Sequence, residues 1–136
     1  MIDIDIARRL RGAGLPWEPR DGDRFVIDNE QLREEVFMLS SMVVEQGRSR
    51  TGGKVLRFNG TTEWALDSVE QHEVLWIPRE DQLREALGDA LAALRQEPEG
   101  GWVVTLRGGD GAEREVPAPR AEDALAGALL VHLSGG

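Results

Sequence analysis

Residues 78–101 read PREDQLREALGDALAALRQEPEGG and carry the strongest periodic signal in the chain. Pro78 can open a helix, and acidic residues in the first turn suit its dipole. Pro98 and the glycines at 100 and 101 can end it. Four leucines follow the spacing of one helix face: Leu83, Leu87, Leu91 and Leu94. The stretch therefore predicts one long helix from Pro78 to Arg95, with one apolar face packed on a sheet.

Two further helices are expected at the ends of the chain. Residues 3–13 place apolar side chains at helical spacing, and Gly14 followed by Leu15-Pro16 stops the pattern. Residues 121–133 repeat the spacing near the C-terminus. Just before them, residues 102–107 and 114–116 predict a hairpin around the glycine-rich loop 108–111.

The segment between the first two helices predicts short strands. Turn signals such as Asp21-Gly22-Asp23 and Asn59-Gly60 separate runs rich in valine and aromatic residues. The runs are 25–27, 35–39, 42–46, 55–58, 64–66 and 74–77. Together with the helices they predict an α+β fold: one domain over residues 1–136, with an antiparallel sheet packed by about three helices in the order α-β(meander)-α-β-β-α.

Composition limits the possible functions. The chain has 136 residues, a net charge of −9 and no cysteine. Cysteine ligation of zinc, thiol nucleophiles and a disulfide scaffold are therefore excluded. No window reaches the roughly 18 apolar residues of a membrane span, and no signal peptide is visible. We expect a cytoplasmic protein that does not bind membranes, with weak non-specific attraction to nucleic acid because of its acidity.

One basic segment stands out in this acidic chain. Arg48, Arg50, Lys54 and Arg57 lie in or beside the glycine-rich stretch 47–53, with no acid among them. They are the candidate residues for binding an anion, a nucleic-acid backbone or an acidic partner; the alternative is a solvated loop. The glycine spacing imitates a phosphate loop, but Gly53 stands where lysine belongs and Lys54 where the hydroxyl belongs.

Other chemical motifs are weak. His72 has acidic neighbours, Asp67, Glu70 and Glu73, but their spacing matches no compact metal site. His132 is expected on the apolar face of the last helix. We therefore predict no catalytic residues, no metal and no cofactor. The four tryptophans, expected mainly in the core, would indicate a binding surface if two lay exposed together: Trp17, Trp64, Trp76 and Trp102.

Two passages carry a resemblance. Residues 58–69 (FNGTTEWALDSV) and 76–83 (WIPREDQL), with the first helix and residues 22–25, resemble small actinobacterial proteins often labelled pilus assembly protein CpaE. The closing hairpin with residues 121–125 is similar to the ending of small phage and prophage proteins of unknown function. Neither resemblance implies a catalytic or binding residue.

The leading hypothesis is a non-enzymatic interaction or regulatory domain that acts through contacts with a protein partner. Three alternatives stay open: an enzyme of unrecognised type, an acidic mimic of nucleic acid, and a nucleic-acid binder that uses residues 47–57. A deep pocket with perturbed ionisable groups would favour the enzyme, and a continuous acidic ridge would favour the mimic.

Overall fold

The computed structural model describes residues 1–29, 34–39, 44–48, 54–58 and 74–135, with the backbone alone for 44–48 and 54–58. The chain forms two compact units, one made of Met1–Pro16 with Pro78–Gly136 and the other of Trp17–Ile77. We call them unit 1 and unit 2. Helices combine with small antiparallel sheets, so the predicted α+β class is confirmed.

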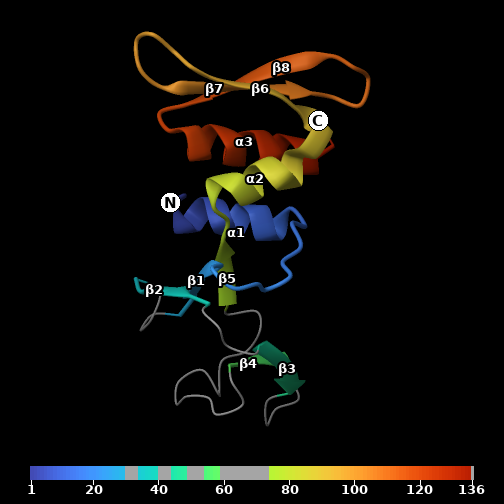
Figure 1. Cartoon of the computed structure of the whole chain (residues 1–136). Helices are drawn as coiled ribbons and strands as arrows, with labels where there is room; N and C mark the ends of the chain where they lie inside the picture. Colours follow the sequence, from blue (N-terminus) through green and yellow to red (C-terminus); the bar gives the residue numbers. More distant parts are fainter. Residues whose placement is uncertain (30–33, 40–43, 49–53, 59–73, 136) are drawn as a thin grey trace. The chain divides into compact units, whose positions relative to one another are not determined.

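Helix α3 (Ala121–Leu133) is the middle layer of unit 1. It packs against the strands β7 (Trp102–Arg107) and β8 (Glu113–Ala118) and against the helices α2 (Glu80–Leu87) and α1 (Ile4–Gly12). Figure 1 shows α3 between the sheet and these two helices. A helix covered from opposite sides must be apolar all round. The sequence AEDALAGALLVHL comes close to this, since its polar residues are confined to the first turn and to His132 in the last turn. Five of its residues are buried: Ala124, Leu125, Ala126, Ala128 and Leu129.

The sheet of unit 1 has the order β6-β7-β8, with β6 spanning Leu91–Gln96. Both strand pairs are antiparallel. Val104 and Leu106 of the central strand are fully buried and, by the alternation of side chains along a strand, lie on the face toward α3. Gly127 allows the close approach, because a Cβ added there would lie 3.2 Å from Cγ1 of Val116. The predicted hairpin 102–116 and the last helix are confirmed.

The long helix predicted from Pro78 to Arg95 is wrong in its second half. Helix α2 ends at Leu87, a short 3₁₀ turn (η3, Gly88–Ala90) follows, and Leu91 begins β6. Gly88 has φ of 52°, a left-handed conformation that favours glycine and breaks the helical path. Leu91 lies opposite Leu106, and Leu94 opposite Val104. Both leucines are half-buried members of a strand, because pairing with β7 outweighs their helical spacing.

Helix α1 agrees with the predicted N-terminal helix. Its buried residues are Ala7 and Leu10, and Ile2 just before it is also fully buried. Gly14, with φ of 98°, lies just past its end, where the sequence predicts the stop. The amine of Met1 pairs with the carboxylate of Glu122 at the start of α3, which joins the two ends of unit 1.

Unit 2 contains a sheet of order β2-β1-β5, formed by Val36–Met38, Arg24–Ile27 and Val74–Ile77. Aromatic rings pack beside it. Trp17 stacks on Trp76 with ring centroids 6.1 Å apart, and Phe25 stacks on Phe37 at 5.5 Å. Trp17 also lies 6.2 Å from Phe25, so the four rings form one continuous group. Trp17 is partly buried and packs against the buried cluster of Phe25, Ile27, Leu39 and Val74.

Asp23 fixes the segment before β1 through hydrogen bonds of its side chain and backbone. Its side chain is fully buried, and its Oδ2 accepts hydrogen bonds from Nε1 of Trp17 at 2.8 Å and from the backbone N–H of Arg20 at 3.0 Å. Its backbone carbonyl accepts the N–H of Leu39 at 2.9 Å. A buried carboxylate is tolerated only when such donors surround it. Asp23 thereby ties the turn predicted at residues 21–23 to the aromatic group.

A separate hairpin in unit 2 pairs β3 (Val44–Arg48) with β4 (Lys54–Phe58). The predicted strands 35–39 and 55–58 match β2 and β4 closely. The strand predicted at 42–46 begins at Val44, with 42 and 43 outside the described residues. The strand predicted at 64–66, and with it Trp64, also lies outside the described residues.

Leu83→Ala should destabilise the protein by about 2–5 kcal/mol, because its side chain has no exposed surface and its loss leaves a cavity. Leu94→Ala is the matched control. It removes the same atoms from a half-buried strand position and should cost less than about 1.5 kcal/mol. Urea titration of both variants measures the difference. Equal costs would contradict the helix end at Leu87.

Asp23→Ala should cost about 1–3 kcal/mol, because it removes the acceptor of two part-buried hydrogen bonds, from the indole N–H of Trp17 and from the N–H of Arg20. Asp23→Asn keeps an oxygen acceptor of the same shape and should cost less. Urea unfolding followed by tryptophan fluorescence compares the two. A nearly neutral alanine variant would show that these hydrogen bonds do not hold the turn.

Candidate functional site

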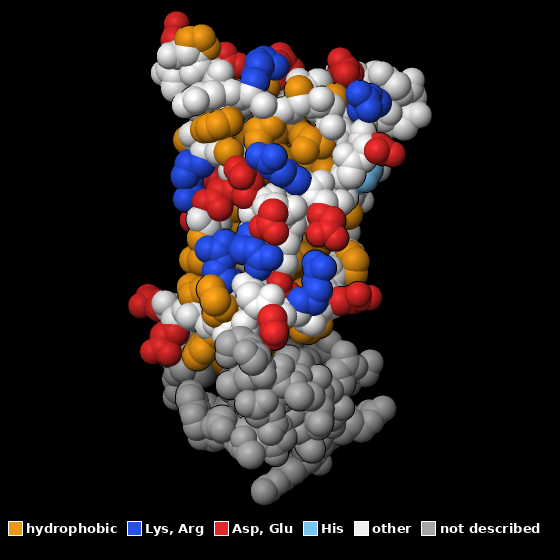
Figure 2. Space-filling model, viewed as in Figure 1, with side chains coloured by type: hydrophobic (Ala, Val, Ile, Leu, Met, Phe, Trp, Pro, Cys, Tyr) orange, Lys and Arg blue, Asp and Glu red, His pale blue; other side chains and the backbone are white. Residues whose placement is uncertain are grey.

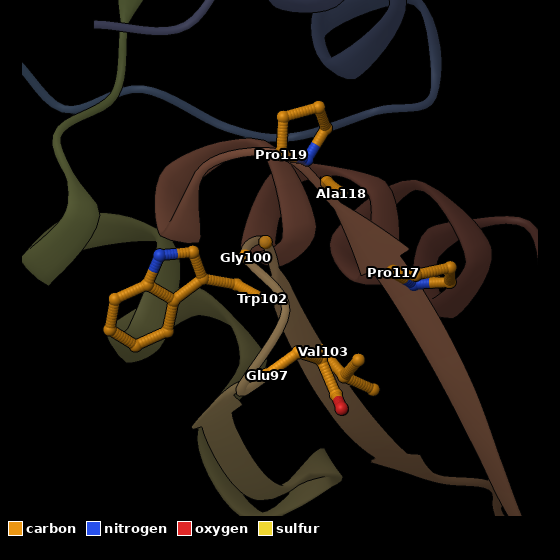
Figure 3. A pocket seen from close by; sticks show the side chains of 8 residues that line it. Glu97, Gly100, Trp102, Val103, Pro117, Ala118 and Pro119 are labelled. Atoms are coloured by element: carbon orange, nitrogen blue, oxygen red, sulfur yellow. The ribbon is translucent and has the colours of Figure 1, made fainter.

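A depression lies at the end of the sheet nearest the β6–β7 turn, beside the outer face of the sheet, which is turned away from α3. Alternation along β7 puts Val103 on this face, and Pro117 lies directly opposite it on β8. In Figure 3 the ring of Trp102 points to the other side of the strand from Val103 and Pro117. The depression has a volume of about 430 Å³ and is lined by Glu97, Gly100, Gly101, Trp102, Val103, Pro117, Ala118 and Pro119.

Glycine in the β6–β7 turn creates this hollow. The turn is closed by hydrogen bonds from the N–H of Glu97 to the carbonyl of Gly101, 3.0 Å, and from the N–H of Gly100 to the carbonyl of Glu97, 3.1 Å. Gly100 and Gly101 have φ of 103° and 88°. A Cβ on Gly101 would stand 3.3 Å from the carbonyl oxygen of Ala118. Without side chains at these positions, the rings of Pro117 and Pro119 stay exposed, while Val103 beside them is buried.

Charged side chains border the depression. Nε of Arg95 lies 3.2 Å from Oε1 of Glu97, and the same guanidinium pairs across β7 with Glu115. The hydrogen bond to Glu115, with the charges of Glu115 and Glu97, raises the pKa of Arg95 above its usual value. Arg95 lies opposite Val103 in the register, so this ion-pair group marks the boundary of the apolar wall along the sheet.

A second ion-pair group stands beyond Pro119. Nε of Arg120 lies 2.8 Å from Oδ2 of Asp123, and its NH1 lies 3.3 Å from Oε1 of Glu122. The hydrogen bond to Asp123 is the main cause that raises the pKa of Arg120. Guanidinium groups on both sides of the depression are thus already bound to carboxylates.

The remaining surface is mixed in charge. Figure 2 shows Arg side chains interleaved with Asp and Glu over the described part of one face. On α2, Arg84 pairs with Glu80, and Arg79 pairs with Asp81. The hydrogen bond from Arg79 lowers the pKa of Asp81. The face drawn in Figure 2 therefore carries no continuous acidic ridge among the described residues, and gives the nucleic-acid mimic no support.

The hairpin β3–β4 carries three of the four predicted basic residues. Arg48 lies directly opposite Lys54 in the register, and Arg57 lies opposite Glu45. The register thus sets two basic residues opposite each other at the end of the hairpin, while Arg57, three positions from Lys54 on the same strand, has an acidic residue opposite it. Arg50 lies outside the described residues. Their role in binding an anionic partner stays a prediction.

The predicted weak motifs fall in different places. His72 and its acidic neighbours at 67, 70 and 73 lie outside the described residues. His132 belongs to α3, as predicted, but its side chain is exposed. Within the described ranges no three histidine or acidic side chains come together as a group that could hold a metal ion. Among the same residues, no helix has the length and apolar character needed to cross a membrane.

Comparison of the chain with protein-family models, curated proteins and solved structures gives no match. The resemblances to actinobacterial and phage proteins therefore stay predictions.

Sequence reasoning missed this depression. Its signals were present but unremarkable: two glycines before Trp102, and two prolines separated by one residue at 117 and 119. Pro117 lies in β8, and Pro119 follows directly after the strand ends at Ala118. What the sequence did not provide was the pairing that sets Pro117 opposite Val103.

Gly101→Ala should cost about 1–2 kcal/mol, because a side chain is disfavoured at φ of 88° and its Cβ would press on Ala118. Gly109→Ala is the control, since a Cβ there meets no atom within 4 Å and its φ is not positive. Thermal unfolding compares the two. If Gly101→Ala were as mild as Gly109→Ala, the close packing of the turn on β8 would be disproved.

Proposed function

We propose that this chain is a non-enzymatic protein-interaction domain, and that the depression beside Val103 and Pro117 receives an apolar side chain of its partner. The observation that carries the proposal is an open hollow with mostly apolar lining at one end of the sheet, bordered by the ion pairs of Arg95 with Glu97 and Glu115. Apolar surface concentrated in this way and rimmed by polar groups is typical of interaction sites.

The lining favours binding over catalysis. Among the lining residues Glu97 alone has an ionisable side chain, and it is paired with Arg95. Catalysis requires several polar groups that converge on a reacting atom, usually in a deep pocket. This hollow instead offers proline rings, a valine and glycine backbone, which suit contact with an apolar side chain.

The size of the site sets the strength of binding. Burial of one large aliphatic side chain contributes about 1.5–3 kcal/mol, whereas a micromolar complex needs about 8 kcal/mol. The partner must therefore also contact the protein surface around the depression. We propose an extended segment that lies over the β7–β8 end of the sheet and anchors one side chain in the hollow. We place this activity in the cytoplasm, as the composition predicts.

Panning a random 12-residue phage-display library on the intact chain tests this function. Pro117 is exposed, so Pro117→Glu should leave the fold intact while putting a bulky charge into the hollow. We expect it to reduce enrichment of selected peptides at least tenfold. Ala112→Glu is the control, because it adds the same side chain at an exposed position in the turn at the far end of β7–β8. Equal enrichment on both variants would reject the site.

A further inference from the structure

We infer that the segment bound in the depression is cationic, with an arginine or lysine next to its apolar anchor. This inference rests on the proposed function and names the chemistry of the partner. Glu97 lines the depression itself, and Glu99 lies in the same turn with an exposed side chain. A partner that enters over this turn therefore meets carboxylates before it reaches the proline walls.

The protein surface around the depression carries more acidic than basic groups. Five carboxylates stand beside or just beyond it, against two guanidinium groups and the amine of Met1, which itself pairs with Glu122. Each of the two guanidinium groups is bound to two carboxylates, so neither presents an uncompensated positive charge to a partner. The carboxylates are Glu97, Glu99, Glu115, Glu122 and Asp123.

The shape of the site also fits a long basic side chain. An arginine next to the apolar anchor can lay its apolar stem along the turn at Gly100 and Gly101 while its guanidinium group reaches the carboxylate of Glu97. A planar guanidinium can bind a carboxylate through two hydrogen bonds, which gives direction to a shallow contact. An anionic segment would instead bring its charge against Glu97 and Glu99. The charge of the rim therefore selects among partners that the apolar hollow alone would accept.

Two phage-display libraries of 12-residue peptides test the inference on the intact chain. They are random except at three fixed positions, which hold arginine in one library and glutamate in the other. At 50 mM salt we expect the arginine library to be enriched at least tenfold over the glutamate library, and this preference to shrink at 500 mM salt because the charges are screened. The double variant Glu97→Gln, Glu99→Gln should reduce the preference at least fivefold. Glu113→Gln, at the opposite end of the same sheet, should leave it unchanged.

The outcomes separate the inference from the function beneath it. Equal enrichment of both libraries, abolished by Pro117→Glu, would keep the interaction site and overturn the cationic partner. Peptide enrichment that Pro117→Glu does not reduce would reject the proposed function itself. A preference for arginine that increases in Pro117→Glu would reveal general attraction to an acidic chain, because that variant blocks the hollow while adding negative charge. Thermal unfolding of every variant confirms that each is folded.

Discussion

Unit 1 depends on the burial of α3 from two opposite sides. A helix in this position cannot present a polar stripe to solvent, so nearly its whole length must be apolar. It must also carry small side chains at its contacts, because the sheet and the helices α1 and α2 approach it closely. Gly127 beneath Val116, with Ala124 and Ala128 fully buried, meets this second demand. The inner face of the sheet and the facing sides of α1 and α2 have buried partners only because α3 lies between them.

Within the described part of unit 1, no helix packs on the outer face of this sheet, where charge and apolar surface are divided along its length. The Arg95–Glu115 pair crosses β7, while the turn end of the sheet has proline, valine and glycine. Surface ion pairs of this kind add little to stability. Here the ion pairs matter because they limit the accessible apolar surface to the end of the sheet near the β6–β7 turn. A small hollow with a charged border recognises a partner by charge as much as by contact area.

The sequence predicted the elements better than their boundaries. Residues 121–133, 102–107 and 4–12 were recognisable because local periodicity and glycine stops agreed with the final packing. Residues 88–95 were not, since Leu91 and Leu94 suit a helix face as well as a strand. The choice between the two is made by Gly88 and by a ladder with β7 that no local pattern reveals.

The site shows the same limit. The basic residues around position 50 are identifiable from the sequence because their charge is a property of each residue. The hollow at Val103 depends instead on the absence of side chains at Gly100 and Gly101. For Asp23 the sequence predicted only a place in a turn, whereas in the structure its carboxylate also accepts a hydrogen bond from the indole N–H of Trp17. Features that arise from pairing between distant segments, or from empty space, leave only faint traces in the sequence.

The pairing of β1 with β5 has a consequence for the order of folding. Unit 1 is built from two stretches of chain separated by all of residues 17–77, and a free loop of that length makes their meeting entropically costly. Arg24 and Ile77 are partners in the ladder, so once it forms, the intervening chain is pinned near both of its ends. During synthesis the residues of unit 2 leave the ribosome before α3 is complete. If unit 2 folds early, it shortens the effective connection between the two stretches of unit 1, so helix α1 can reach α3 at a lower entropic cost once α3 has been made.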